Sequence, residues 1–137
     1  MTRERYDPDD AREWLNRARS TLHWACQSAP EIYLEELYFG AQQAAEKAIK
    51  GVFVHLREPF PYTHDLDRLL MLLSQKRIDV PDSVRRAREL SVFALELRYH
   101  SVGKETTEEQ YRKALAIAEA VVRWAEEIIL AGGRQPG

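Results

Sequence analysis

Nine residues, Gly40-Ala41-Gln42-Gln43-Ala44-Ala45-Glu46-Lys47-Ala48, form the stretch that decides the fold. They lie inside a longer segment, from about Glu31 to Arg57, in which apolar residues recur every three or four positions. This spacing predicts one long α-helix. Its apolar side consists of Leu34, Leu37, Ala41, Ala44, Ala48, Val52 and Leu56. The small side chains of the stretch let a second helix pack close to it. Gly51, which costs up to about 1 kcal/mol inside a helix, indicates the same close approach.

One helix is predicted before this central helix in the sequence, and a short one is predicted after it. The first begins at Asp7-Pro8-Asp9-Asp10, where Asp7 can cap the helix and Pro8 suits its first turn. Pro30 either ends this helix or opens the central one. After a loop with two prolines, Thr63 is expected to cap a short helix. The inward positions are Ala11, Leu15, Ala18, Leu22 and Ala25 in the first helix, and Leu66, Leu69, Leu70 and Leu73 in the short one.

The last two helices follow in the second half of the chain. One begins near Pro81-Asp82-Ser83, and Gly103 is its expected stop. Its inward positions are Val84, Ala87, Leu90, Ala94 and Leu97. The other opens with Thr107-Glu108-Glu109-Gln110, the pattern of a capping box. This last helix is apolar over a wide arc, so its face either completes the core or forms a dimer surface.

Long helices joined by short connections favour antiparallel neighbours. The sequence therefore predicts an all-α fold, an up-and-down four-helix bundle made of the first, second, fourth and fifth helices with one additional short helix. We expect a single domain over residues 1–130 and a disordered C-terminal tail over residues 131–137, which is rich in glycine.

The composition is that of an ordinary globular domain, with 45% apolar and 31% charged residues among 137. A net charge of −2 does not indicate binding of nucleic acid or of an anionic membrane by the molecule as a whole. Cys26 is the single cysteine, so an internal disulfide is excluded. No apolar run approaches the roughly 18–20 residues that cross a bilayer, and residues 1–10 are too charged for a signal peptide. We therefore expect a cytoplasmic protein with no membrane partner.

Several motifs, in order along the chain, resemble one known family. The segment from Ala41 to Lys50 looks like the signature helix of HEPN domains, and Thr63-His64-Asp65-Leu66 resembles the start of that family's next helix. Leu97-Arg98-Tyr99 is similar to its Arg-Tyr element, and Thr106-Thr107-Glu108-Glu109 to its last one. The resemblance implies a HEPN-like helical bundle that forms a homodimer. It also implies a small nucleotidyltransferase as partner, often in a toxin–antitoxin-like pair.

The same resemblance raises the question of catalysis at Arg98 and His100. Many HEPN proteins are metal-independent RNases that use an Arg-x4-6-His motif, whereas others bind nucleotides or act as partners. After Arg98 the only histidine is His100, two positions on, so the motif is degenerate. Two residues so spaced point to different sides of a helix and would converge only across a dimer. Arg57 and His64 have the spacing but straddle a proline loop, so catalysis is not transferred to them. The favoured reading is an ion-paired Arg98, a packed Tyr99 and a helix-capping His100.

Nucleotide or partner binding is the second candidate activity, and its predicted residues are Gln43, Lys47, Lys50, His64 and Tyr99. Amides and amines along the central helix could hold a base or a phosphate in a groove. The alternative, favoured by chemistry alone, is a solvated helix face with an ordinary ion pair from Glu46 to Lys50. For His64 the alternative is a capping or packing role at a helix start.

Two other sets of polar residues give weaker signals of function. The basic residues Lys76, Arg77, Arg85, Arg86 and Arg88 form a possible phosphate-binding patch, but acidic neighbours favour a solvated surface. The four histidines have no metal-ligand spacing, and no metal or cofactor is expected.

Two functional hypotheses follow. The favoured one is a non-catalytic interaction and nucleotide-binding module that partners a nucleotidyltransferase. The alternative is an RNase toxin in which Arg98 and His100 meet at the dimer interface.

Overall fold

The computed structural model describes residues 4–91 and 105–132, and within these ranges every regular element is a helix. The helices are α1 (Ala11–Ala25), α2 (Leu34–Leu56), α3 (Leu66–Gln75), α4 (Asp82–Arg85) and α6 (Glu108–Gly132). Residues 88–91 are helical as well. The all-α prediction is thus confirmed.

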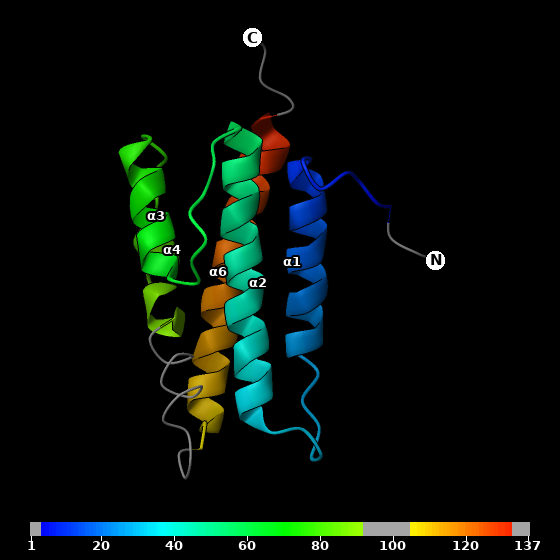
Figure 1. The fold of residues 1–137 in the computed structure, drawn as a ribbon. Coiled ribbons are helices and arrows are strands. Elements are labelled where there is room, and N and C mark those ends of the chain that lie inside the picture. The colour runs from blue at the N-terminus through cyan, green and yellow to red at the C-terminus, as the bar shows by residue number, and fades with distance from the viewer. Residues whose placement is uncertain (1–3, 92–104, 133–137) are drawn as a thin grey trace.

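The three long helices α1, α2 and α6 pack side by side, and α2 lies at the centre of the assembly (Figure 1). α1 runs antiparallel to α2, and α6 runs in the same direction as α2. α3 and α4 lie on the far side of α2 from α1. This arrangement is the predicted all-α helical bundle with α3 as a short addition, and of the fourth helix of the predicted four-helix core the described residues include only α4 and residues 88–91.

The small residues of α2 have the consequence expected from the sequence, because two tryptophans of α1 lie against its glycines. A Cβ atom added at Gly40 would lie 2.5 Å from Cζ3 of Trp24. A Cβ atom added at Gly51 would lie 3.0 Å from Cβ of Trp14. The predicted close approach is confirmed, and α1 packs along α2 where side chains are missing.

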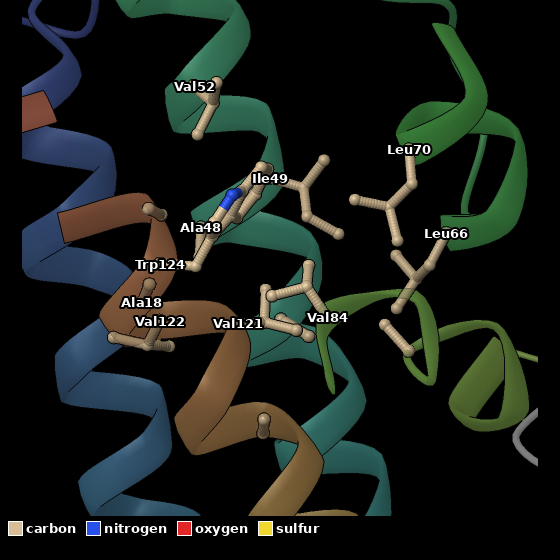
Figure 2. Packing of buried hydrophobic residues seen from close by; sticks show 14 of the residues in the cluster. Ala18, Ala48, Ile49, Val52, Leu66, Leu70, Val84, Val121, Val122 and Trp124 are labelled. Carbon is tan, nitrogen blue, oxygen red and sulfur yellow. The ribbon is translucent and has the colours of Figure 1, made fainter. Parts of the chain in front are cut away.

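The core fills the space between α2, α6 and α3. Figure 2 shows Ile49 of α2, Val121 of α6 and Leu66 of α3 converging from three directions. All three side chains are completely inaccessible to solvent. Val84 of α4 joins them, so the short helices extend the core of the long ones.

The wide apolar arc of α6 is used within the chain. The buried residues of this arc form two neighbouring rows, Ala114, Ile117, Val121 and Trp124 in one and Tyr111, Ala118, Val122, Ala125 and Ile129 in the other. The Tyr111 hydroxyl donates to the carbonyl oxygen of Ala25, and Trp124 Nε1 donates to the carbonyl oxygen of Asp79 at 3.0 Å. α1 and α2 cover one side of this face, and the α3–α4 region covers the other. The face therefore completes the core, which is one of the two alternatives predicted for it.

Two helix starts differ from the prediction. The cap of α1 is Asp10, not Asp7: its carboxylate accepts from Arg12 N at 2.9 Å, and Asp7 only closes a preceding turn. The cap of α3 is Asp65, not Thr63, because the Asp65 carboxylate reaches two helix N–H groups. In both cases several capping residues stand close together, and their spacing alone does not choose between them.

The capping box of the last helix is confirmed in both directions. Thr107 N donates to Oε1 of Gln110 at 2.9 Å, and Gln110 N donates to Oγ1 of Thr107 at 3.1 Å. The helix predicted from Pro81 is wrong in its continuity, because α4 ends at Arg85 and turns at residues 86–87 before helix resumes. Its predicted inward positions Ala94 and Leu97 lie outside the described residues.

Shortly after the end of each of α2 and α3 lies an arginine in the left-handed backbone conformation, Arg57 with φ 57° and Arg77 with φ 66°. In each case the next residue donates back across the last turn, Glu58 N to Phe53 O at 3.0 Å and Ile78 N to Leu73 O at 3.1 Å. This is the Schellman ending, in which glycine is the favoured residue.

Replacing these arginines with glycine should stabilise the protein. Arg57→Gly and Arg77→Gly each relieve a Cβ clash, so we expect the free energy of unfolding to rise by about 0.5–1 kcal/mol. Urea denaturation measures the change. The matched control is Arg123→Gly in the middle of α6, where the same substitution should cost about 1 kcal/mol. Destabilisation at Arg57 as large as at Arg123 would contradict the prediction.

Candidate functional site

The polar strip predicted along α2 is not a solvated face. Gln42, Glu46 and Lys50, four residues apart, are only 3%, 5% and 8% exposed. The favoured alternative of an ordinary exposed ion pair is therefore wrong for this row. Charged groups seldom lose their water unless they are paired.

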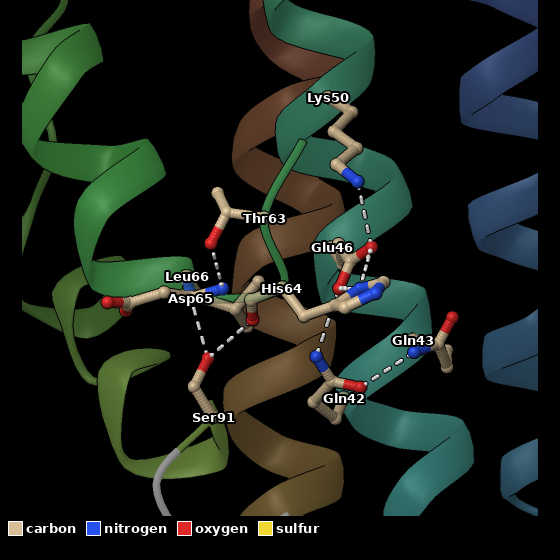
Figure 3. A network of polar contacts seen from close by, with 9 residues as sticks. All are labelled: Gln42, Gln43, Glu46, Lys50, Thr63, His64, Asp65, Leu66 and Ser91. Atoms are coloured by element: carbon tan, nitrogen blue, oxygen red, sulfur yellow. Dashed lines mark hydrogen bonds and ion pairs between the residues drawn. The ribbon is translucent and has the colours of Figure 1, made fainter. Parts of the chain in front are cut away.

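The Glu46 carboxylate is the centre of a polar cluster (Figure 3). Lys50 Nζ donates to its Oε2 at 2.9 Å, and Gln42 Nε2 donates to its Oε1 at 3.2 Å. Nδ1 of His64 lies 3.0 Å from both carboxylate oxygens. Gln43 extends the cluster, because its Nε2 donates to Oε1 of Gln42 at 2.9 Å. Three side chains thus converge on one buried carboxylate.

His64 reaches this carboxylate because both of its chain neighbours are fixed. Thr63 Oγ1 accepts from Asp65 N, and Asp65 caps α3. Ser91 Oγ donates to the carbonyl oxygen of His64 at 3.2 Å and accepts from Leu66 N at 2.8 Å. The imidazole is therefore neither a helix cap nor a core group. It links the α2–α3 connection to α2.

The chemistry of the pair fixes the proton on the imidazole. An ionised carboxylate only accepts hydrogen bonds, so Nδ1 of His64 carries a proton and donates it toward Glu46. The side chain is 58% exposed, and no described residue hydrogen-bonds Nε2. This second nitrogen can hydrogen-bond a ligand. Lys50, in contrast, is buried, and its ammonium pairs with Glu46 and lies 5.2 Å from the centre of the Phe60 ring.

Lys47 and Gln43 occupy the side of α2 that faces α1. Lys47 Nζ donates to Oγ1 of Thr21 at 2.8 Å. Burial, and secondarily the nearby Arg17 guanidinium, lower the pKa of the Lys47 ammonium, whereas Glu46 raises it. Lys47 also lines an open groove of about 570 Å³ between α2, α1 and residues 4–5. The predicted residues therefore divide between two adjoining regions, the Glu46 cluster and this groove.

Residues of α1 complete the groove and were not anticipated from the sequence. Glu13 and Arg17 are joined by a 2.8 Å ion pair, and Thr21 continues the same face one turn later. The signal available was their i,i+4 spacing, which places all three on one side of a helix. Glu13 is 2% exposed although it is charged, and nothing local predicts that.

The candidate catalytic residues Arg98 and His100, together with Tyr99, lie outside the described residues, so their roles stay predictions. Ser91, the last described residue before that segment, contacts the His64 backbone.

Among the remaining charged groups, the basic cluster after α3 is dispersed. Lys76 pairs with Glu58 at 3.2 Å and Arg86 with Glu89 at 3.3 Å. Arg85 donates to Ser74 at 3.0 Å. In residues 4–91 and 105–132 no group of three or more His, Cys, Asp or Glu side chains is placed to hold a metal ion.

The model of the HEPN domain family matches residues 11–128, which is most of the chain. The chain belongs to the HEPN family. No curated protein and no solved structure gives a significant match. Within this HEPN domain, none of the described helices combines the length and the apolar character needed to span a bilayer.

Breaking the buried ion pair should unfold the domain more easily. Lys50→Met keeps the length of the side chain but leaves Glu46 without its cation, so we expect a loss of about 3 kcal/mol in unfolding free energy. The control is Lys113→Met, because Lys113 pairs with Glu109 at 3.7 Å in solvent and such pairs contribute less than about 1 kcal/mol. Equal losses in chemical denaturation would contradict the buried arrangement.

The carboxylate of Glu13 should make stability depend on pH. The Tyr6 N–H, and after it the Arg17 side chain, lower the pKa of Glu13 below its usual value of 4.5. A lowered pKa means that the stabilisation is complete above about pH 4.5 and is lost as pH falls through the folded-state value. The Tm difference between the wild type and Glu13→Gln should therefore shrink on acidification. A difference that does not shrink on acidification would contradict it, and Glu109→Gln, at an exposed carboxylate of α6, is the matched control.

Proposed function

We propose that this HEPN domain is a nucleotide-binding and interaction module that acts as a cytoplasmic homodimer and partners a nucleotidyltransferase-type protein. The observation that carries the proposal is the buried Glu46 carboxylate, with Lys50 and His64 gathered on it in the signature helix. Replacing a buried ion pair with apolar side chains is often neutral or stabilising. Its presence here therefore favours a positioning role over a purely structural one.

The cluster is suited to present donors and acceptors to a ligand. Glu46 fixes the orientation of His64, whose side chain is more than half exposed, and the Gln42–Gln43 pair extends the polar cluster toward α1. Side chains held in place by other side chains lose little freedom on binding. A ligand along α2 would meet the imidazole on one side and the Lys47 amine on the other.

Partner binding is proposed from the family together with the surface that the fold leaves open. Tyr62 stands beside His64, with the two rings at a 6.0 Å centroid distance, and its own side chain is almost fully exposed. Exposed aromatic side chains are common anchors at protein interfaces. The rim of the candidate site thus carries a residue type that suits contact with another chain.

One feature supports the alternative function of a metal-independent RNase. An imidazole oriented by a carboxylate is the arrangement of a general base, and the candidate residues Arg98 and His100 follow Ser91, which contacts His64, in the chain. In that case a base would take the proton of a 2′-hydroxyl, and a cation would stabilise the charge on phosphorus.

Titration calorimetry with nucleoside phosphates tests the first proposal. We expect saturable binding by the wild type and an affinity about tenfold weaker for His64→Gln, because one oriented hydrogen bond is lost. His23→Gln is the matched control, since His23 is exposed on α1. No binding of any nucleotide, and no complex with a co-expressed nucleotidyltransferase from the same genome, would overturn the proposal.

RNA cleavage in the presence of a chelator decides between the two functions. Metal-independent cleavage that disappears in Arg98→Ala and His100→Ala, with folding intact by circular dichroism, would establish the RNase. Absence of cleavage by the wild type leaves the binding module as the function.

A further inference from the structure

The groove beside α1 lies outside the HEPN signature helix except for one residue. Lys47 is its contribution from α2, whereas Arg17 and Thr21 come from α1 and Arg5 from the segment before α1. Its volume of about 570 Å³ falls within the roughly 300–1,000 Å³ of ligand pockets. The groove is thus a separate feature, and most of the side chains that line it lie outside the signature helix.

Three cations face this groove, and each keeps donors to spare. Arg17 uses Nε for Glu13, and no described residue bonds its two terminal nitrogens. Lys47 spends one of its three donors on Thr21. Arg5 touches Glu13 only at 3.6 Å, and its side chain is 80% exposed. These groups can turn hydrogen-bond donors toward a common anion.

The two carboxylates in the groove are already occupied. Glu13, which is buried, accepts from Tyr6 N at 3.0 Å as well as from Arg17. Glu4 accepts from the Tyr6 hydroxyl at 3.1 Å. Three cations against two engaged carboxylates leave an excess of positive charge. The mutual repulsion of Lys47 and Arg17, which helps to lower the pKa of Lys47, would be relieved by a bound anion.

The segment that carries Arg5 is fastened along α1. Asn16 Nδ2 donates to the carbonyl oxygen of Glu4 at 3.0 Å, and Trp14 Nε1 donates to that of Pro8 at 2.8 Å. The Arg12 guanidinium lies 4.1 Å from the centre of the Tyr6 ring. One wall of the groove is therefore held by contacts at several points along its length.

We infer that this groove is the phosphate subsite of a small nucleoside phosphate, with Lys47, Arg17, Thr21 and Arg5 as the phosphate-binding residues. The inference rests on the proposed nucleotide-binding function and deepens it, because it places the phosphate between α1 and α2 and the base toward His64. A mononucleotide fits better than RNA. The excess charge is small and confined to one groove, whereas binding along an RNA backbone needs many cations.

The test compares four probes by titration calorimetry: a nucleoside, its monophosphate, inorganic pyrophosphate and a single-stranded RNA oligonucleotide. The wild type should bind the monophosphate at least about tenfold more tightly than the nucleoside, because charge-assisted hydrogen bonds to phosphate exist only there. Lys47→Met and Arg17→Met should each remove about tenfold of that affinity and so narrow the difference between monophosphate and nucleoside. Arg123→Met, on the exposed side of α6, should change nothing.

Two further variants separate an effect on phosphate binding from an effect on folding or packing. Arg5→Met alters a side chain that is 80% exposed and approaches Glu13 only at 3.6 Å, so it reports on the groove even where Lys47→Met fails to fold. Arg17→Lys keeps a cation and should retain more affinity than Arg17→Met. A role of Arg17 in packing alone would make both variants equally weak for nucleoside and monophosphate, and that result would overturn the inference.

The outcomes separate this inference from the function on which it rests. Nucleotide binding that is lost in His64→Gln but unchanged in Lys47→Met, Arg17→Met and Arg5→Met would keep the function and overturn the phosphate subsite. Pyrophosphate binding that these variants weaken, without binding of any nucleotide, would keep an anion groove and overturn the nucleotide function. Binding of the oligonucleotide alone would overturn the small-molecule assignment.

Discussion

The close packing of α1 against α2 is the constraint on which the other features depend. Gly40 and Gly51 leave space into which Trp24 and Trp14 fit, and α2 can then be covered on its other sides by α6 and α3. A helix enclosed in this way has little room for solvated polar groups. The charges that α2 carries must therefore be neutralised by neighbours, and the Glu46 cluster does this on one side of the helix.

Much of the fold could be predicted from the sequence, because apolar periodicity and capping patterns are local. The capping box at Thr107 and the close approach at Gly51 are examples in which neighbouring residues contain the whole signal. The exact caps of α1 and α3 could not be chosen, since competing residues such as Asp7 and Asp10 stand within one turn. The interruption after Arg85 was missed because the apolar spacing continues through it.

The candidate site was predictable only in part. The spacing of Glu46 and Lys50 is the same for a buried pair and an exposed one, so burial had to come from the packing of other helices. The contact between Glu46 and His64 spans 18 positions, and that between Lys47 and Thr21 spans 26. No local pattern encodes such contacts. The groove residues of α1 went unnoticed for the same reason, although their spacing was visible.

The Gln43–Gln42–Glu46 row has a direction. Each amide nitrogen donates toward the next group, Gln43 to Gln42 and Gln42 to Glu46, so all the dipoles point at the carboxylate. Hydrogen bonds aligned head to tail polarise one another. A donor that binds the carbonyl oxygen of Gln43 would thus strengthen the bonds from Gln43 to Gln42 and from Gln42 to Glu46. Because the carboxylate only accepts, a stronger bond from Gln42 draws electron density from it and weakens its bond to His64. The row therefore ends at Glu46, where Gln42, Lys50 and His64 share the same two carboxylate oxygens, so each of the three bonds limits the strength of the others.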